Sequence, residues 1–155
     1  MDANLADRRK VGVLRARGEY ALIMLQAVAA GEKLFRLAGI ETGTPTRYSI
    51  QIGGDQHLDC SPDIGEQDLL DRYFWRFMNH SCAPSVTIAY PYVVALRDLA
   101  PWDAVTFNYN TTEWDMAEPF ACRCGAESCL GEIKGFKHLT KAQIDQLPAV
   151  APYLG

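Results

Sequence analysis

The sequence predicts a mainly β domain with many short strands and little helix. Short segments alternate polar and apolar side chains or are rich in β-branched residues, and 12 glycines and 8 prolines interrupt them. Few segments have the periodicity of an amphipathic helix. The 155 residues fit one domain, which would bury roughly two-thirds of its unfolded surface.

The first half of the chain is predicted to contain strands separated by loops. Residues 1–10 are polar and charged, so we expect a flexible N-terminus. Residues 11–40 are apolar and β-leaning, and within them residues 32–37 alternate as a half-buried strand does. Residues 41–47 form a loop by composition, residues 48–52 alternate again, and residues 57–65 are expected to be irregular.

The second half is predicted to begin with the longest helix. Residues 66–78 carry leucines and aromatic residues at helical spacing. Residues 86–89, 92–96 and 105–109 are β-branched and are predicted to be strands. Residues 141–147 are expected to form a short terminal helix that Thr140 caps.

Composition and charge exclude several classes of protein. With 48% hydrophobic and 22% charged residues, the chain is not collagen-like, coiled-coil or wholly disordered. Its net charge of −4 argues against broad electrostatic capture of nucleic acid and suits a basic partner. The longest apolar stretch is too short for a membrane span, and the N-terminus does not look like a secretory signal.

Three of the five cysteines, Cys122, Cys124 and Cys129, lie close together in a glycine-rich segment. Thiolates at this spacing can converge on one tetrahedral zinc ion, with Cys82, Cys60, a histidine or water in the fourth position. The alternative is a set of free thiols. Either interpretation favours a reducing, intracellular location, cytoplasmic or nuclear.

Two further segments concentrate polar groups. An Asn-His-Ser-Cys run follows the predicted helix at Asn79, where the asparagine and histidine could instead cap the helix C-terminus. The strand over residues 105–109 ends at Tyr109, which by itself is typical of a core tyrosine.

Taken in order, these three segments resemble the signatures of SET-domain protein lysine methyltransferases with a cysteine-rich post-SET tail. The resemblance covers roughly residues 11–136 and includes Gly31-Glu32 and Arg97-Asp98 of the family's strands. It implies a mainly β SET fold of several small curved sheets, short helices and a knot-like C-terminal crossing. It also implies a SET domain at 11–116, a post-SET zinc segment at 117–136 and a C-terminal helix and tail at 137–155. Because the insert is short and no cysteine-rich segment precedes the domain, a minimal, stand-alone type is expected.

The resemblance assigns roles to individual residues. Tyr109 corresponds to the family's active-site tyrosine, and Phe107 to a position that affects how many methyl groups are added, here permitting di- or trimethylation. A structural zinc would be bound by Cys82, Cys122, Cys124 and Cys129, leaving Cys60 as an ordinary residue. S-adenosylmethionine would be bound by a larger set of residues: Glu19, Tyr20, Arg76, Phe77, Met78, Asn79, His80 and Tyr109.

The chain departs from the family pattern at three places, and at one of them, where Trp102-Asp103 replaces a glycine-glutamate before the Tyr109 strand, only the turn is expected to differ. The cofactor loop keeps only its first glycine, Gly18, and has Ala21 where a second is usual. Leu37 replaces a tyrosine that helps to form the wall of the family's active site, which could slow catalysis, alter the substrate, or mean that Tyr48 or Tyr92 serves instead.

The predicted function is methyl transfer from S-adenosylmethionine to a lysine ε-amine in a histone-like or other basic protein. The alternative is a catalytically weak or silent SET module that binds a peptide or partner, and a third hypothesis is a zinc-stabilised scaffold without a small ligand. We expect a monomer or homodimer that does not contact nucleic acid or membranes directly.

Overall fold

The computed structural model describes residues 9–155, and its strands form five small sheets. Most of the flexible N-terminus expected at 1–10 therefore lies outside the described residues. The mainly β fold with short helices is confirmed, whereas the division at residues 116 and 136 stays a prediction.

The N-terminal strands form three of these sheets. β1 (Val11–Ala16) and β2 (Glu19–Met24) form an antiparallel hairpin. β4 (Ile40–Thr42), β6 (His57–Asp59) and β5 (Ile50–Gln51) form a second sheet in that order. β3 (Lys33–Arg36) pairs with β9 (Tyr92–Ala95), which in turn pairs with β8 (Val86–Ala89).

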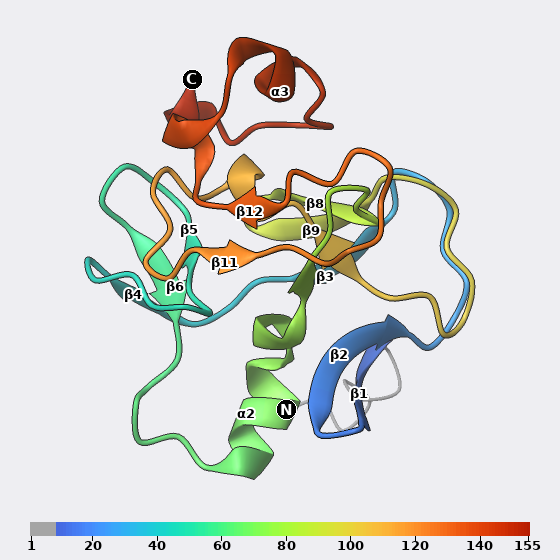
Figure 1. The fold of residues 1–155 in the computed structure, drawn as a ribbon. Helices are drawn as coiled ribbons and strands as arrows, with labels where there is room; N and C mark the ends of the chain where they lie inside the picture. The colour runs from blue at the N-terminus through green and yellow to red at the C-terminus, as the bar shows by residue number, and fades with distance from the viewer. Residues whose placement is uncertain (1–8) are drawn as a thin grey trace.

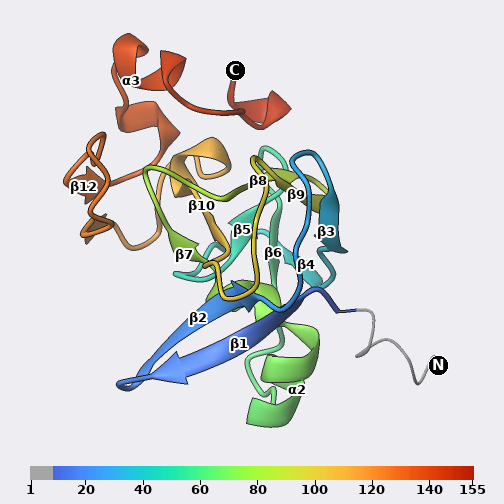
Figure 2. The same ribbon diagram turned by 90° about the vertical axis from the view of Figure 1, so that its right-hand side faces the viewer.

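Two shorter sheets bring the later segments together. β7 (Asn79–His80) pairs in parallel with β10 (Thr106–Phe107), and β11 (Phe120–Ala121) pairs with β12 (Glu132–Ile133). The β1–β2 hairpin and helix α2 (Glu66–Arg72) lie at one end of the molecule (Figure 1). Helix α3 (Lys141–Asp145) and the C-terminus lie at the opposite end (Figure 2).

Single-turn 3₁₀ helices connect the remaining elements. They are η1 (Phe74–Phe77), η2 (Tyr109–Thr111), η3 (Phe136–His138) and η4 (Pro152–Leu154). No helix within residues 9–155 is long and apolar enough to cross a membrane.

The predicted helix over 66–78 was wrong in its extent. α2 ends at Arg72, and Tyr73 leaves helical geometry with φ −115° and ψ 30° before η1 begins. This break lets Trp75 enter the core, where its indole N–H donates to the Ala38 carbonyl at 2.9 Å. Burial of an aromatic side chain outweighs the weak preference of this segment for a continuous helix.

Other predictions differ at the ends of elements. Residues 57–59, expected to be irregular, form the central strand β6, and all three are buried. The predicted strand over 105–109 ends at Phe107, so Tyr109 begins η2. The predicted terminal helix ends at Asp145 rather than at residue 147, and the side chain of Thr140 caps it as expected.

Candidate active site and thiol cluster

The β1–β2 turn presents the first residues of the site. Arg17 (φ 54°) and Gly18 (φ 77°) occupy its two central positions, and both have the left-handed geometry of a tight hairpin. The turn places Glu19 and Tyr20 at the start of β2. Ala21 is part of the regular ladder opposite Leu14, so its Cβ is accommodated there.

The parallel pairing of β7 with β10 brings two distant sequence segments together. Asn79 is opposite Thr106 and His80 is opposite Phe107. The Asn79 amide also donates to the Tyr20 carbonyl at 3.2 Å, which ties β7 to β2. Residues from the hairpin, from the Asn-His run and from the tyrosine segment therefore meet at one place.

These segments surround a cavity of about 740 Å³. Seven of the residues predicted to bind cofactor line it: Glu19, Tyr20, Arg76, Phe77, Asn79, His80 and Tyr109. Met78 does not line this cavity. Its side chain is buried in the core, and with Phe107 it lines an adjacent inner cavity of about 10 Å³.

Tyr109 lies between the two cavities and contributes to both walls. Its hydroxyl donates a hydrogen bond to the Met78 carbonyl at 2.5 Å. Burial raises the pKa of this phenol, so it stays protonated. Because its one proton is used by Met78, the hydroxyl oxygen can only accept hydrogen bonds from a molecule in the cavity.

His80 connects the tyrosine to the cysteine segment. Burial lowers its pKa to about 4, so the ring is neutral. Its Nδ1 accepts from the Tyr109 backbone N–H at 3.1 Å, which leaves the ring proton on Nε2. That nitrogen lies 3.3 Å from the Cys82 sulfur and donates to it.

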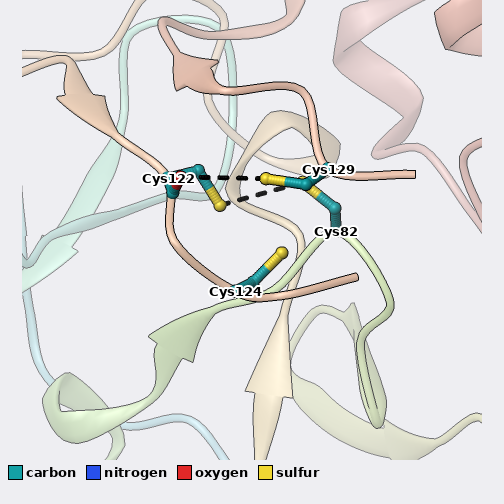
Figure 3. A group of neighbouring side chains, drawn as sticks. All are labelled: Cys82, Cys122, Cys124 and Cys129. Atoms are coloured by element: carbon teal, nitrogen blue, oxygen red, sulfur yellow. Dashed lines mark hydrogen bonds between the residues drawn. The ribbon is translucent and has the colours of Figure 1, made fainter. Parts of the chain in front are cut away.

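Four cysteine sulfurs point toward one another, as Figure 3 shows, and the Cys82 sulfur is the one that contacts His80. The sulfurs of Cys82, Cys122, Cys124 and Cys129 all lie within 4.8 Å of one another. Zn–S bonds of about 2.3 Å in a tetrahedron place sulfurs about 3.8 Å apart, and Cys82 and Cys122 are separated by 3.9 Å. The donor set and its spacing therefore fit a zinc ion, whereas Cys60 is outside the cluster.

The cysteine segment also covers the cavity. Cys122, Arg123 and Cys124 line it, and the Phe120 ring packs edge-on against the rings of His80 and Tyr109 with both centroids 5.8 Å away. We call residues 120–133, which include β11 and β12, the lid. Holding the four sulfurs together would hold the lid over the cavity.

The departure at Leu37 lies away from this site. Leu37 is buried in the core, and Tyr92 packs under Lys33 outside the cavity walls. Tyr48, the other candidate, lines both cavities and is half exposed. Of the two tyrosines considered from the sequence, the structure brings only Tyr48 to the site.

Several lining residues were not identified from the sequence, and four of them bear on the chemistry of the site. Arg47 and Arg123 join Arg76 on the cavity wall, Phe120 lies on the lid, and Glu113 lines the inner cavity. Arg47 and Arg76 both stack on Tyr48, with guanidinium carbons 5.6 and 5.2 Å from its ring centre. Except for the lid residues, which lie beside the cysteines, no local pattern marks them.

The chain is similar to known methyltransferases along most of its length. It is 33% identical to "Methyltransferase flvH" of Aspergillus flavus over 119 residues, which cover 74% of this chain and 60% of that protein. It is 27% identical to a "Histone-lysine N-methyltransferase, H3 lysine-4 specific" of Kluyveromyces lactis, covering 84% of this chain and 15% of the relative. It therefore spans 60% or less of the length of these relatives. No family model matches it.

A solved structure shares the fold. The structure of KRYPTONITE in complex with mCHG DNA and SAH superposes with a TM-score of 0.59 at 21% identity, covering 79% of this chain and 28% of that one. A complex of KRYPTONITE with mCHH DNA, an H3(1-15) peptide and SAH gives a TM-score of 0.57. The chain is therefore similar in sequence to proteins named histone-lysine methyltransferases, and its fold is the SET-domain fold of KRYPTONITE.

Proposed function

We propose that this chain transfers a methyl group from S-adenosylmethionine to the ε-amine of a lysine in a protein substrate. The observation that carries the proposal is the β7–β10 pairing, which places Asn79, His80 and Tyr109 around one cavity. Its volume of about 740 Å³ is in the usual range for small-molecule sites. The relatives named as histone-lysine methyltransferases and the SAH named for the neighbour structure support the same chemistry.

Few catalytic groups are needed for this reaction. S-adenosylmethionine supplies a methyl group that its sulfonium already makes electrophilic, so the protein must align the amine and keep it neutral. The Tyr109 oxygen, which can only accept, is suited to orient the amine by accepting one of its N–H groups. The aromatic walls formed by Phe107 and Tyr109 favour the neutral amine because they exclude water.

A structural zinc ion is part of the proposal. Cys82, Cys122, Cys124 and Cys129 would bind it and leave no open position, so its role would be to fix the lid. Burial raises the pKa of the Cys122 thiol to about 12. Zinc binding would therefore have to displace a proton there, and acid should weaken it.

The substrate class is proposed from the relatives and from charge. An H3(1-15) peptide is named for one neighbour structure, and the net charge of −4 suits a basic tail. The cavity wall itself carries Arg47, Arg76 and Arg123 against Glu19. Attraction of a basic segment would therefore depend on the outer surface rather than on the cavity. Phe107, which has no hydroxyl to hold water, is proposed to permit more than one methylation.

Binding and transfer can be tested separately. Calorimetry with S-adenosylmethionine measures the first, and mass spectrometry of a synthetic H3(1–15) peptide and of a lysine-containing peptide library measures the second. We expect micromolar cofactor binding and a mass increase of one or more methyl groups. Binding without transfer would favour the silent peptide-binding module, and no binding up to high micromolar concentration would contradict both.

Other expectations stay predictions. An intracellular location, cytoplasmic or nuclear, is consistent with five free cysteines among the described residues. A monomer or homodimer without direct nucleic-acid binding is still expected, although DNA is named in both neighbour structures. Light scattering and a DNA-binding titration would test these two expectations.

A further inference from the structure

Glu113 is a buried carboxylic acid four residues after the proposed active-site tyrosine. Only 7% of its surface is exposed, and its backbone N–H donates to the Tyr109 carbonyl at 3.0 Å. Burying an ionisable group costs free energy unless it is well compensated. None of the five salt bridges among the described residues involves Glu113. Its position is therefore not explained by an ion pair.

The two carboxyl oxygens of Glu113 have different surroundings. Oε2 accepts from the Gln51 backbone N–H at 2.9 Å and from the Thr112 hydroxyl at 2.6 Å. Within residues 9–155, Oε1 receives no hydrogen bond from a protein group. It is also not completely shielded from solvent, unlike the buried polar atoms that lack a hydrogen-bond partner. One oxygen thus fixes the side chain, while the other is available to a molecule next to it.

That molecule would occupy the inner cavity. Glu113 lines it with Phe107, Tyr109 and Tyr48, and its volume of about 10 Å³ is close to the smallest space that holds one water. Tyr48 and Tyr109 also line the large cavity, so the two spaces share a wall. The Phe107 and Tyr109 rings pack on each other with centroids 4.7 Å apart, so a lysine amine would approach Tyr109 from the large cavity and reach Glu113 by way of the inner cavity that Tyr109 also lines.

We propose that Glu113 is the proton acceptor for the substrate ammonium, directly or across one water molecule. This inference rests on the proposed methyltransferase function and extends it. Among the described residues, Glu113 is the only carboxyl group that lines the inner cavity, and Glu19 is the only one that lines the large cavity.

The proton balance is complete within the site. The Glu113 carboxylate takes one proton from the lysine ammonium, which leaves a neutral amine and a carboxylic acid. The amine lone pair then forms the N–CH₃ bond while the S–CH₃ bond breaks, and its electron pair stays on sulfur. The products are a methylated ammonium and a neutral thioether, and Glu113 afterwards releases its proton to solvent.

The groups that face Glu113 allow this role. They come from each element packed around it and are Arg47 and Tyr48 from the loop before β5, Arg76 from η1, Tyr109 from η2 and Tyr153 from η4. Arg76 is already 3.1 Å from Asp59. Burial raises the pKa of Glu113 to about 7, partly offset by its two hydrogen bonds. An acid with this pKa is ionised about half the time at neutral pH, which suits proton transfer.

The test compares pH profiles of methyl transfer to the H3(1–15) peptide, or to a library peptide that the wild type methylates. The wild-type rate should fall below about pH 7. Glu113→Gln keeps an oxygen for Gln51 and Thr112 but cannot take a proton, so its rate at pH 7 should fall by about 10²-fold. The loss should shrink as the pH approaches the lysine pKa of about 10.4. S-adenosylmethionine binding should be unchanged.

Two further variants keep the test decisive. Asp115→Asn removes an exposed carboxyl that pairs with Lys137 and His138, and its profile should match the wild type. Thr112→Val removes a donor that favours the ionised form, so the acid limb should move up by about one pH unit. If Glu113→Gln does not fold, this shift decides the question.

The outcomes separate the two proposals. A wild-type chain that transfers no methyl group overturns the proposed function, and the role of Glu113 with it. An active wild type whose pH profile is unchanged by Glu113→Gln, or by Thr112→Val where the first variant does not fold, overturns only the role of Glu113.

Discussion

Replacing Tyr109 by phenylalanine should separate cofactor binding from methyl transfer. The substitution removes one oxygen and keeps the ring, which packs 4.7 Å from Phe107 and 5.3 Å from His80 between centroids. It also leaves the Met78 carbonyl without its hydroxyl donor. An unpaired buried acceptor costs about 1–3 kcal/mol. For a domain of this size, a loss of about 2 kcal/mol lowers Tm by about 4–8 °C.

The effect on turnover should be larger than the effect on stability. The hydroxyl oxygen is the acceptor that the proposal places beside the amine, and loss of one preorganised polar group in a dry site costs about 10²–10³-fold in kcat. Calorimetry should show S-adenosylmethionine binding within about threefold of wild type, because the backbone of residues 79 and 80 is unchanged. Methyl transfer should be measured by mass spectrometry at a temperature where both proteins are folded.

Tyr92→Phe is the matched control, since this tyrosine packs on Lys33 outside the cavity. It should transfer methyl groups at the wild-type rate. If Tyr109→Phe transfers at the same rate as Tyr92→Phe, the hydroxyl has no part in the reaction and the assigned role of Tyr109 is refuted.

Three other perturbations have defined outcomes. Chelation or Cys124→Ser should release the lid, giving faster hydrogen exchange in β11 and β12 and at least tenfold weaker cofactor binding, while exchange in β8 and β9 stays slow. Gly135→Ala should lower the free energy of unfolding by about 3 kcal/mol in urea titrations. The new Cβ would lie 2.6 Å from the Trp114 carbonyl oxygen, and the backbone of residue 135 has a positive φ of 117°. Gly54→Ala is the control and should not change stability, because a Cβ there would meet no atom within 4 Å. Since the pKa of Glu113 is raised to about 7, the wild type should lose about 3 kcal/mol of stability between pH 4.5 and pH 8 from this residue, and Glu113→Gln should lose much less over the same range. Equal slopes for the two proteins would contradict the raised pKa.

Local patterns predicted the strands that have one buried face. β8 and β9 alternate or are β-branched between prolines, and both were predicted nearly to the residue. β6 was missed because His57, Leu58 and Asp59 are all buried, so no alternation exists. When tertiary packing buries polar residues such as His57 and Asp59, the local sequence does not reveal that they are buried.

The site residues likewise fall into those that local motifs predicted and those that only tertiary packing brings together. The Asn-His run, Tyr109 and the cysteines were identified because their residue types and order are specific within short segments. Arg47 and Glu113 were not, since nothing near them in sequence shows that the loop before β5 and the turn after η2 line the same inner cavity. Only the packing of β5 against the segment that follows Tyr109, through the Gln51 N–H and Glu113, brings them together.

The contacts of His80 connect Tyr109 and the thiol cluster in one structural unit. One neutral ring accepts from the Tyr109 backbone and donates to Cys82, so the position of the tyrosine backbone and that of a proposed zinc ligand are linked through a single side chain. Phe120 on the lid packs on the same two rings, His80 and Tyr109. Opening the cluster would therefore remove both the cover of the cavity and one support of the tyrosine. The four thiols would thus stabilise the geometry on which the proposed methyl transfer depends, although none of them has a part in the proposed reaction itself.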